Sequence, residues 1–382
     1  MPVDRILGAL LDPINLQTLI TGLVYASLVL TLNLEYGWTG IPNFGKVAFI
    51  AMGGIATYWV LSFYVYPSAA AYYGLDGYPT ELGSYEHVVF MINYALPYLG
   101  ENLGAYLAFM ALSMALAMIL GGVFGLAMAY PVARLREDYL AILLLMASFL
   151  VWNLLTGVDS LIGGSIGVRT TYETLKLVFG DVDLGRLVMT AAFFIAIYLI
   201  VDRLTHSPYG RSLRAVRDDE TAAATMGKDV TRIRLQVIFV ASMLAAMGGV
   251  IMILFLYSSA NPDLFKPEFT FMLIAMMLLG GVGNNLGAVF GVFAFLYIFR
   301  AATALTAGNI PEGLGGEGFV RNMLTGILIL LVLYFRPRGI IPETSVRTPA
   351  WLVFKERLGY IPVYARGILS RVHEGVRARY RR

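Results

Sequence analysis

One stretch of the sequence comes close to a phosphate-binding motif. Residues 40–47 read GIPNFGKV, which follows the Gly-x4-Gly-Lys-Ser/Thr form of a nucleotide-binding loop up to the last position. There the motif needs a hydroxyl group that binds magnesium, and Val47 has none. The motif also needs a preceding strand and a soluble α/β domain around it, and the sequence offers neither. We therefore interpret the match as accidental.

Residue types that serve in catalysis and metal binding are scarce. The sequence has no cysteine, which excludes disulfides, thiolate metal sites and a thiol nucleophile. Its three histidines, His87, His206 and His373, fall in separate polar segments, so they lack the spacing of metal ligands. No Ser-His-Asp or paired-carboxylate arrangement stands out within an apolar segment. The sequence predicts no catalytic residue and no metal site, and the chain is not expected to be an enzyme.

The composition identifies the class of protein. Of 382 residues, 58% are hydrophobic and only 14% are charged, with a mean hydropathy of +0.71. Soluble proteins carry roughly 25% charged residues, so too few charges remain here to cover the surfaces of soluble domains. Intrinsic disorder is excluded by the same abundance of apolar and aromatic residues. The composition indicates a polytopic membrane protein.

Apolar runs predict the membrane-spanning segments. A spanning helix needs about 20 mostly apolar residues, because the hydrocarbon core is about 30 Å thick. The sequence predicts an all-α polytopic integral membrane protein with about nine transmembrane helices, within a range of eight to ten. The first run lacks the basic start and the cleavage site of a signal peptide, so it is expected to be retained. The nine runs are 14–34, 42–64, 103–131, 139–157, 186–203, 235–257, 265–282, 286–303 and 320–336.

Glycine clusters point to helix packing and to helix breaks. Most Gly pairs, such as Gly53-Gly54, are expected to let helix backbones pack closely. Two stretches that combine Gly with Asn, near 36–48 and 280–287, instead favour broken or re-entrant helices. Such breaks are tolerated where protein buries the exposed backbone, and they often mark the passage of a transporter.

The distribution of charge predicts orientation. The 65–102 segment has no Lys or Arg, whereas 203–234 has seven and 338–382 has ten against three acidic residues. Arg134 and Arg136 mark another short basic loop. Because basic loops stay in the cytoplasm, the N-terminus is expected outside and the C-terminus inside. This topology gives a transmembrane domain at 1–337, with an extracytoplasmic loop at 65–102 and a cytoplasmic loop at 204–234. A basic cytoplasmic tail follows at 338–382, and it is interpreted either as binding anionic membrane lipid, which is the simpler interpretation, or as contacting a cytoplasmic partner.

Ionisable residues are rare within the predicted spans. Glu35, Lys46, Glu268 and Arg300 lie near span ends, where water or headgroups are expected to reach them. Lys46 in particular is expected to extend its amine to the inner interface. An ion-coupled carrier usually keeps ionisable residues at the middle of the membrane, so this distribution argues against that class.

The 204–234 loop contains a predicted helix. Pro208 and Gly210 favour a turn, residues 211–226 favour a helix without a wide apolar stripe, and Gly227 suits its end. The helix is interpreted either as a solvated connector or as a docking element for a cytoplasmic partner. In the second interpretation, Ala222 and Ala223 permit close approach and the flanking charges set the register.

Residues in this loop resemble a known family. Glu220, Ala222-Ala223 and Gly227 resemble the Glu-Ala-Ala…Gly coupling loop of ABC importer permeases. The run from Ser207 to Arg217 is similar to that of branched-chain amino acid permeases of the LivH/LivM type, closest to LivM-like subunits. Further similar segments, which extend the resemblance over roughly residues 20–340, are 33–40, 43–49, 161–168, 262–265, 279–284 and 335–339.

The resemblance implies a subunit of a larger transporter. The chain would be a permease that forms the membrane pathway for branched-chain amino acids, in the cytoplasmic membrane of a prokaryote. Its partners would be a second, LivH-like permease, two cytoplasmic ABC ATPases and an extracytoplasmic solute-binding protein, with no nucleic acid. The chain would bind no cofactor, since the ATPases would use ATP and Mg. Two alternatives remain: a same-family permease for urea, short amides or another small polar solute, and an ion-coupled secondary carrier.

The resemblance also suggests two sets of functional residues. The sequence departs from the family pattern at Lys46, where His is frequent, and at Ile166, where Asp is common. If either position contacts solute in relatives, the substrate of this chain can differ from theirs. The predicted ATPase-coupling residues are Arg217, Glu220, Ala222, Ala223 and Gly227. The predicted pathway residues are Asn43, Gly45, Lys46, Gly163, Gly164, Ser165, Gly280, Gly281, Gly283 and Asn284.

Overall fold

The computed structural model describes most of the predicted transmembrane domain. The described residues are 13–132, 137–164, 167–306, 339–343 and six single positions between 323 and 334. All of them belong to one compact unit, Met1–Glu343. The predicted ninth span, 320–336, lies outside them except at those single positions, and so does the basic tail after residue 343. The short basic loop with Arg134 and Arg136 also lies outside them.

Six long apolar helices match the first six predicted spans. Among the described residues, six helices are long and apolar enough to cross a membrane. Two of them continue through π-helical turns: α3 through η1 (Leu61–Val65) into α4 (Tyr66–Tyr72), and α14 into η4 (Met252–Tyr257). The six are α2 (Pro13–Thr39), α3 (Lys46–Val60), α7 (Leu103–Val132), α8 (Glu137–Gly157), α11 (Val182–His206) and α14 (Val230–Ile251).

The seventh and eighth predicted runs form a bent pair. Helices α15 (Glu268–Gly280) and α16 (Asn285–Thr306) are separated by a short turn and bend by 114°. At about 1.5 Å per residue, α15 is only about 20 Å long, which is too short to cross the hydrocarbon core. The pair therefore fits the predicted broken or re-entrant helix near 280–287. The described residues contain at most seven spans if this pair counts as one.

Two helices form the centre of the bundle. About four fifths of the spanning windows of α3 and α14 are buried, 83% and 78%, against 33% for α8 and 28% for α11. Close approach explains the burial: a Cβ at Gly53 of α3 would overlap the backbone of α14 at Ala246, and one at Gly249 would overlap the carbonyl of Ile50. These Gly pairs serve helix packing, as the sequence predicts.

Short elements cover one end of the bundle. The predicted outer loop folds into α4, α5 (Tyr85–Phe90), η2 (Met91–Ala95) and α6 (Leu96–Glu101). A two-residue strand, β1 (Val168–Arg169), pairs antiparallel with β2 (Ser259–Ala260). Four further short helices are α9 (Asp159–Ile162), η3 (Glu173–Leu175), α10 (Lys176–Phe179) and η5 (Pro262–Phe265).

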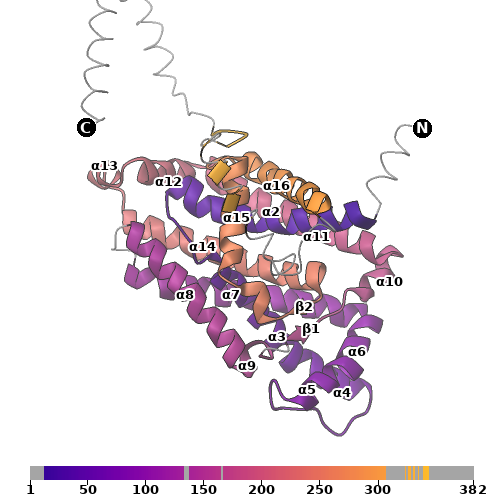
Figure 1. The fold of residues 1–382 in the computed structure, drawn as a ribbon. Coiled ribbons are helices and arrows are strands. Elements are labelled where there is room, and N and C mark those ends of the chain that lie inside the picture. Colours follow the sequence, from indigo (N-terminus) through magenta and orange to yellow (C-terminus); the bar gives the residue numbers. More distant parts are fainter. Residues whose placement is uncertain are drawn as a thin grey trace, which may run out of the picture. The chain divides into compact units, whose positions relative to one another are not determined.

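The predicted cytoplasmic loop lies at the opposite end and contains two helices (Figure 1). The prediction of one helix over 211–226 is wrong, because α12 (Pro208–Asp218) ends where α13 (Glu220–Thr225) begins. Asp219 between them is extended, and its carboxylate accepts a hydrogen bond from the Ala222 amide at 2.9 Å, which starts a new helix.

The first of these two helices buries a narrow apolar face. Leu213 and Val216 are both fully buried, whereas Asp218 at the end of α12 is exposed. Gly210 packs against the backbone of Thr205 at the end of α11. The helix α12 therefore lies with one face on the membrane domain and does not stand free as a solvated connector.

Candidate functional site

A buried ion pair joins the first two spans. The Lys46 Nζ atom, at the start of α3, lies 2.9 Å from Glu35 Oε2 on α2, and both side chains are fully buried. The same ammonium donates to the carbonyl of Ala241 on α14 at 3.2 Å and to that of Thr31 at 3.4 Å. The expectation that Glu35 and Lys46 reach water or headgroups is therefore wrong. The protein itself supplies the counter-charge and the acceptors that a buried ammonium requires.

The loop between these spans is held by its own polar groups. Asn43 Nδ2 donates to Glu35 Oε2 at 3.0 Å, and Asn43 Oδ1 accepts from the Gly45 amide at 3.1 Å. Gly45 lies against the backbone of α8, where a Cβ would overlap the carbonyl oxygen of Leu144. Three predicted pathway residues, Asn43, Gly45 and Lys46, thus belong to one buried cluster. Within it, Glu35 Oε1 is a buried acceptor without a hydrogen-bond partner.

A second predicted group lies at the end of the bundle that carries β1. Gly163 and Gly164 follow α9 with positive φ angles of 83° and 59°. A Cβ at Gly164 would overlap the carboxylate of Asp159, so this turn requires glycine. Ser165 and Ile166 lie outside the described residues. The turn is distant from α12 and α13 in Figure 1, so the structure does not bring this group to the predicted coupling residues.

A third predicted group forms the turn between α15 and α16, which comprises residues 281–284. Gly281 and Gly283 have positive φ angles of 129° and 77°. Gly280 packs directly on the backbone of Gly287 and Gly291, which lets the two helices meet at the sharp bend. The 339–343 segment runs along this turn, and its Ile340 and Ile341 amides each donate to a carbonyl at the end of α15 at 2.9 Å.

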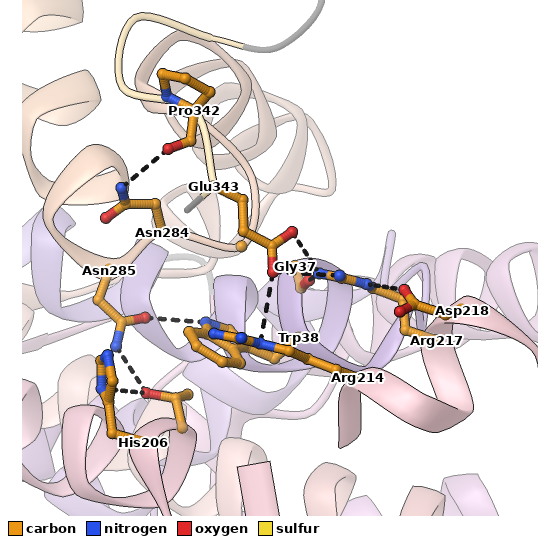
Figure 2. A network of polar contacts seen from close by, with 12 residues as sticks. Gly37, Trp38, His206, Arg214, Arg217, Asp218, Asn284, Asn285, Pro342 and Glu343 are labelled. Carbon is orange, nitrogen blue, oxygen red and sulfur yellow. Dashed lines mark hydrogen bonds and ion pairs between the residues drawn. The ribbon is translucent and has the colours of Figure 1, made fainter. Parts of the chain in front are cut away.

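Asn285, at the start of α16, connects this turn to α2 and α11. Its Oδ1 accepts from Asn33 Nδ2 and from Trp38 Nε1, each at 3.1 Å. Its Nδ2 donates to Thr205 Oγ1 on α11 at 2.9 Å. The Gly283 amide donates to Asn33 Oδ1 at 3.0 Å. All four side chains are buried, so the α15–α16 turn is tied to two spanning helices by a satisfied polar network. Figure 2 shows the part of it that joins Asn285 to Trp38.

Arg217 joins the predicted coupling loop to this turn. Its guanidinium donates to the carbonyl of Gly37 and pairs with both carboxylate oxygens of Glu343, at 3.0 and 3.2 Å. Arg214, one turn earlier on α12, places its guanidinium 4.2 Å above the Trp38 ring and 3.5 Å from Glu343 (Figure 2). The structure thus brings a predicted coupling residue together with Gly283 and Asn284, the predicted pathway residues of the α15–α16 turn.

The remaining predicted coupling residues lie apart from this network. Glu220 pairs with Arg234 of α14, and Ala223 is buried with 3% of its surface exposed. Ala222 is exposed, and Gly227 has a φ of 80° with no atom near its missing Cβ. Met226 between them is 83% exposed. Of the predicted set, Arg217, Glu220 and Ala223 therefore contact the bundle or are buried, whereas Ala222 and Gly227 lie on an exposed surface together with Met226, which was not predicted.

Several residues in these clusters were not predicted as site residues. Asn33 and Asn285 carry polar side chains beside apolar runs, a signal that marks functional positions in membrane helices. Nothing in the sequence indicates that Arg214 contacts Trp38. Glu343 stands out only as an acidic residue at the start of a basic tail. Within the part of the chain that the structure describes, no group of His, Cys, Asp and Glu is arranged to hold a metal ion.

The sequence is similar to known proteins over most of its length. The profile of the family described as "Branched-chain amino acid transport system / permease component" matches residues 14–335. A probable branched-chain amino acid transport permease protein LivM from Methanocaldococcus jannaschii is 33% identical over 89% of this chain and 96% of its own.

Two enterobacterial proteins are more distant relatives. The high-affinity branched-chain amino acid transport system permease proteins LivM of Salmonella typhimurium and Escherichia coli are 26% and 25% identical. Each match covers 60% of this chain and 56% of the relative. The long match to the family and the similarity to the archaeal relative show that this polytopic membrane protein belongs to the family of branched-chain amino acid ABC transporter permeases.

Proposed function

We propose that the chain forms one half of the membrane pathway of an ABC importer for branched-chain or related hydrophobic amino acids. ATP hydrolysis by partner subunits would drive the transport, and the chain would do no covalent chemistry. The observation that carries this proposal is the position of α12 and α13. One face of α12 is packed on the membrane domain through Leu213 and Val216, while the end of α13 projects Met226 outward.

The exposed surface of α13 is suited to an ATPase subunit. Ala222, Met226 and Gly227 are all exposed, and small residues allow a partner to approach the helix closely. Arg217 lies on the other side of the same connection and pairs with Glu343, whose segment is hydrogen-bonded to Asn284 of the α15–α16 turn. A displacement of α13 by the ATPase would therefore be transmitted to the α15–α16 turn. Coupling between two sites requires such a connection.

The α15–α16 bend and the loop at Asn43–Lys46 are the proposed walls of the pathway. Helix α15 is too short to span the hydrocarbon core, and transporters commonly build solute sites from such discontinuous helices. Alternating access would then move the bent pair against the centre formed by α3 and α14. The turn at Gly163–Gly164 would lie on the extracytoplasmic side of the same pathway.

The proposed partners follow from the surfaces of the bundle. A LivH-like permease would cover part of the apolar faces of the outer helices, and lipid the rest. One of the two ATPases would bind at α13 and the other at the second permease, and a solute-binding protein would deliver solute at the end with α4, α5 and α6. The absence of Lys and Arg from 65–102 supports an extracytoplasmic location for that end, and the basic tail supports a cytoplasmic C-terminus.

Copurification tests the ABC assembly. When the tagged permease is expressed with its ATPase and permease partners, the ATPases are expected to copurify with it. Met226→Asp places a charge on the docking surface and should remove the ATPases while the second permease is retained. Tyr85→Asp is the matched control, because Tyr85 is 81% exposed at the opposite end of the bundle. ATPase retention by Met226→Asp would contradict docking at α13.

A ligand screen on the solute-binding partner tests the substrate. The names of the relatives favour leucine, isoleucine and valine over urea or short amides. Calorimetric titration of the purified partner is expected to show binding of these three amino acids and none of urea or acetamide. The reverse selectivity would replace the proposed substrate class while leaving the ABC assembly intact.

A further inference from the structure

Glu343 is the one described acidic residue that contacts both arginines on the inner face of α12. It pairs with Arg217 through two contacts of 3.0 and 3.2 Å and with Arg214 at 3.5 Å. Such bidentate pairing of a guanidinium with a carboxylate is directional as well as attractive. The Glu343 side chain is 27% exposed and that of Arg217 is 21% exposed, so solvent and salt screen this pair less than an open surface pair.

The backbone around Glu343 belongs to the α15–α16 turn. Ile340 and Ile341 donate to the carbonyls of Leu279 and Gly280 at 2.9 Å, and Asn284 Nδ2 donates to the Pro342 carbonyl at 3.3 Å. The 339–343 segment is therefore fixed to the turn through three hydrogen bonds. Glu343 in this position connects the turn to α12, although sequence analysis assigned it to the basic tail.

Helix α12 is also attached to α2 without Glu343. Arg217 donates to the carbonyl of Gly37, and the Arg214 guanidinium stacks on Trp38. These contacts keep α12 on the bundle if the carboxylate is neutralised. Glu343 thus supplies the ion pairs between α12 and the 339–343 segment, whereas the attachment of α12 to α2 has its own contacts (Figure 2).

We propose that Glu343 is a coupling residue, which transmits the displacement of α12 to the α15–α16 turn and so links ATP hydrolysis to opening of the pathway. This inference rests on the proposed function. In the proposed mechanism, the ATPase displaces α13 and α12. Arg214 and Arg217 then displace Glu343, and the 339–343 segment moves the end of α15. Without the carboxylate, hydrolysis would proceed while the bent pair stays in place.

Transport measurements with the full importer reconstituted in liposomes test this role. Glu343→Gln is expected to leave assembly and basal ATPase activity within about twofold of wild type, since the contacts of α12 with α2 remain. Solute taken up per ATP hydrolysed should fall by about tenfold, within the range of coupling between distant sites. Glu343→Asp, which keeps the charge, should restore a substantial part of that ratio.

Asp218→Asn is the matched control. Asp218 also pairs with Arg217, at 3.2 Å, but its side chain is 69% exposed and the structure gives it no contact with the α15–α16 turn. Its uptake per ATP should therefore equal that of wild type. If Glu343→Gln matches this control, the proposal is overturned. If the Glu343→Gln variant loses assembly or basal ATPase activity together with uptake, the residue only holds the fold, which also overturns it.

Distance measurements with spin labels separate coupling from a structural role. Because the chain has no cysteine, cysteines for the labels can be introduced at Arg211 on α12, Leu286 and Leu150, all exposed, in a complex with cysteine-free partners. In wild type, ATP should shift both the 211–150 and the 286–150 distances. In Glu343→Gln, only the 211–150 distance should shift, and a shift of both would contradict the proposal. A wild-type importer that shows no ATP-driven uptake would instead contradict the proposed function.

Discussion

The pair of Glu35 and Lys46 is the most deeply buried charge in the described part of the chain. Both side chains are fully buried, and their contacts join α2, α3 and α14. Burial of two charges is costly, so the pair stabilises the fold only weakly against an apolar replacement. Removal of only one partner strongly destabilises the fold, because it leaves an uncompensated charge inside the protein.

Variants of Lys46 and Glu35 test the loss of stability that follows when one charge of the buried pair is left without its partner. Lys46→Met should lower the free energy of unfolding by about 3–5 kcal/mol, since Glu35 is left buried and unpaired. Adding Glu35→Gln should recover much of this loss. The measurement is denaturant unfolding of the purified chain in detergent. Equal stability of Lys46→Met and the double variant would contradict this expectation, because it would show that the Glu35 charge left behind costs no stability.

His87 gives the outer helices a dependence on pH. It is buried beside Tyr58 and Tyr66, its Nε2 lies 3.2 Å from Ser62 Oγ, and burial lowers its pKa to about 4. The unfolded chain binds the proton with a pKa near 6.5, so the folded state loses stability as the pH falls from about 6.5 toward 4. The melting temperature of wild type should therefore drop between pH 7 and pH 5.

The variant His87→Gln serves as the control for this effect. It removes the titrating group, so its melting temperature should depend less on pH across the same interval. Wild type and variant both keep Glu81 and Glu86 on the same segment, so a difference between their pH dependences comes from His87. An equal drop for wild type and variant would assign the pH dependence to other groups.

At the scale of elements, the proposed coupling loop depends on how the chain passes from α12 to α13 and from α13 to α14. Asp219 ends one helix and caps the next, and Gly227 ends α13 in a left-handed conformation with open space around it. A substitution at Gly227 therefore acts through the backbone, because a side chain at a φ of 80° is strained whatever the space. The strain would change the path of the chain between α13 and α14.

Gly227→Val should abolish stimulation of the partner ATPases while the chain still inserts in the membrane. A β-branched residue is strongly disfavoured in the left-handed region, so the end of α13 must rearrange. Gly74→Val is the matched control, since Gly74 has a φ of 65°, open space and a position at the opposite end of the bundle. The measurement is ATP hydrolysis by the reconstituted importer. Normal stimulation with Gly227→Val would remove Gly227 from the coupling surface.

The sequence predicted elements well where the signal is local. Apolar runs of about 20 residues predicted the first six spans, and Gly with Asn predicted the break between α15 and α16. The helix over 211–226 was wrong because the local preference of Asp219 for a cap outweighed the helix formers around it. Each correct prediction depended on residues close together in the chain.

Contacts between distant residues account for what the sequence did not predict. Lys46 was expected in water because its partner, Glu35, lies on the preceding helix and only the fold reveals their approach. Glu343 was counted with the basic tail, since nothing in its neighbourhood indicates Arg214 or Arg217 more than a hundred residues earlier. The predicted coupling and pathway residues were named separately, and their junction at Gly283 required the three-dimensional structure.

At the scale of the whole molecule, the described spans carry few ionisable groups. Their fully buried charges, Glu35 and Lys46, lie against each other and compensate each other. Three further charged residues, Arg214, Arg217 and Glu343, meet at the α12 end of the bundle. The described part of the chain is therefore better suited to a source of energy that acts from outside it, as proposed for α12 and α13.

Uptake of radiolabelled leucine into proteoliposomes tests this central claim most directly. The vesicles contain the permease pair with or without the ATPases, ATP is enclosed, and the loaded solute-binding protein is added outside. Uptake is expected only when the ATPases and ATP are both present, and it should be insensitive to proton and sodium gradients. Uptake by the permease alone, driven by an ion gradient and without ATP, would contradict the account.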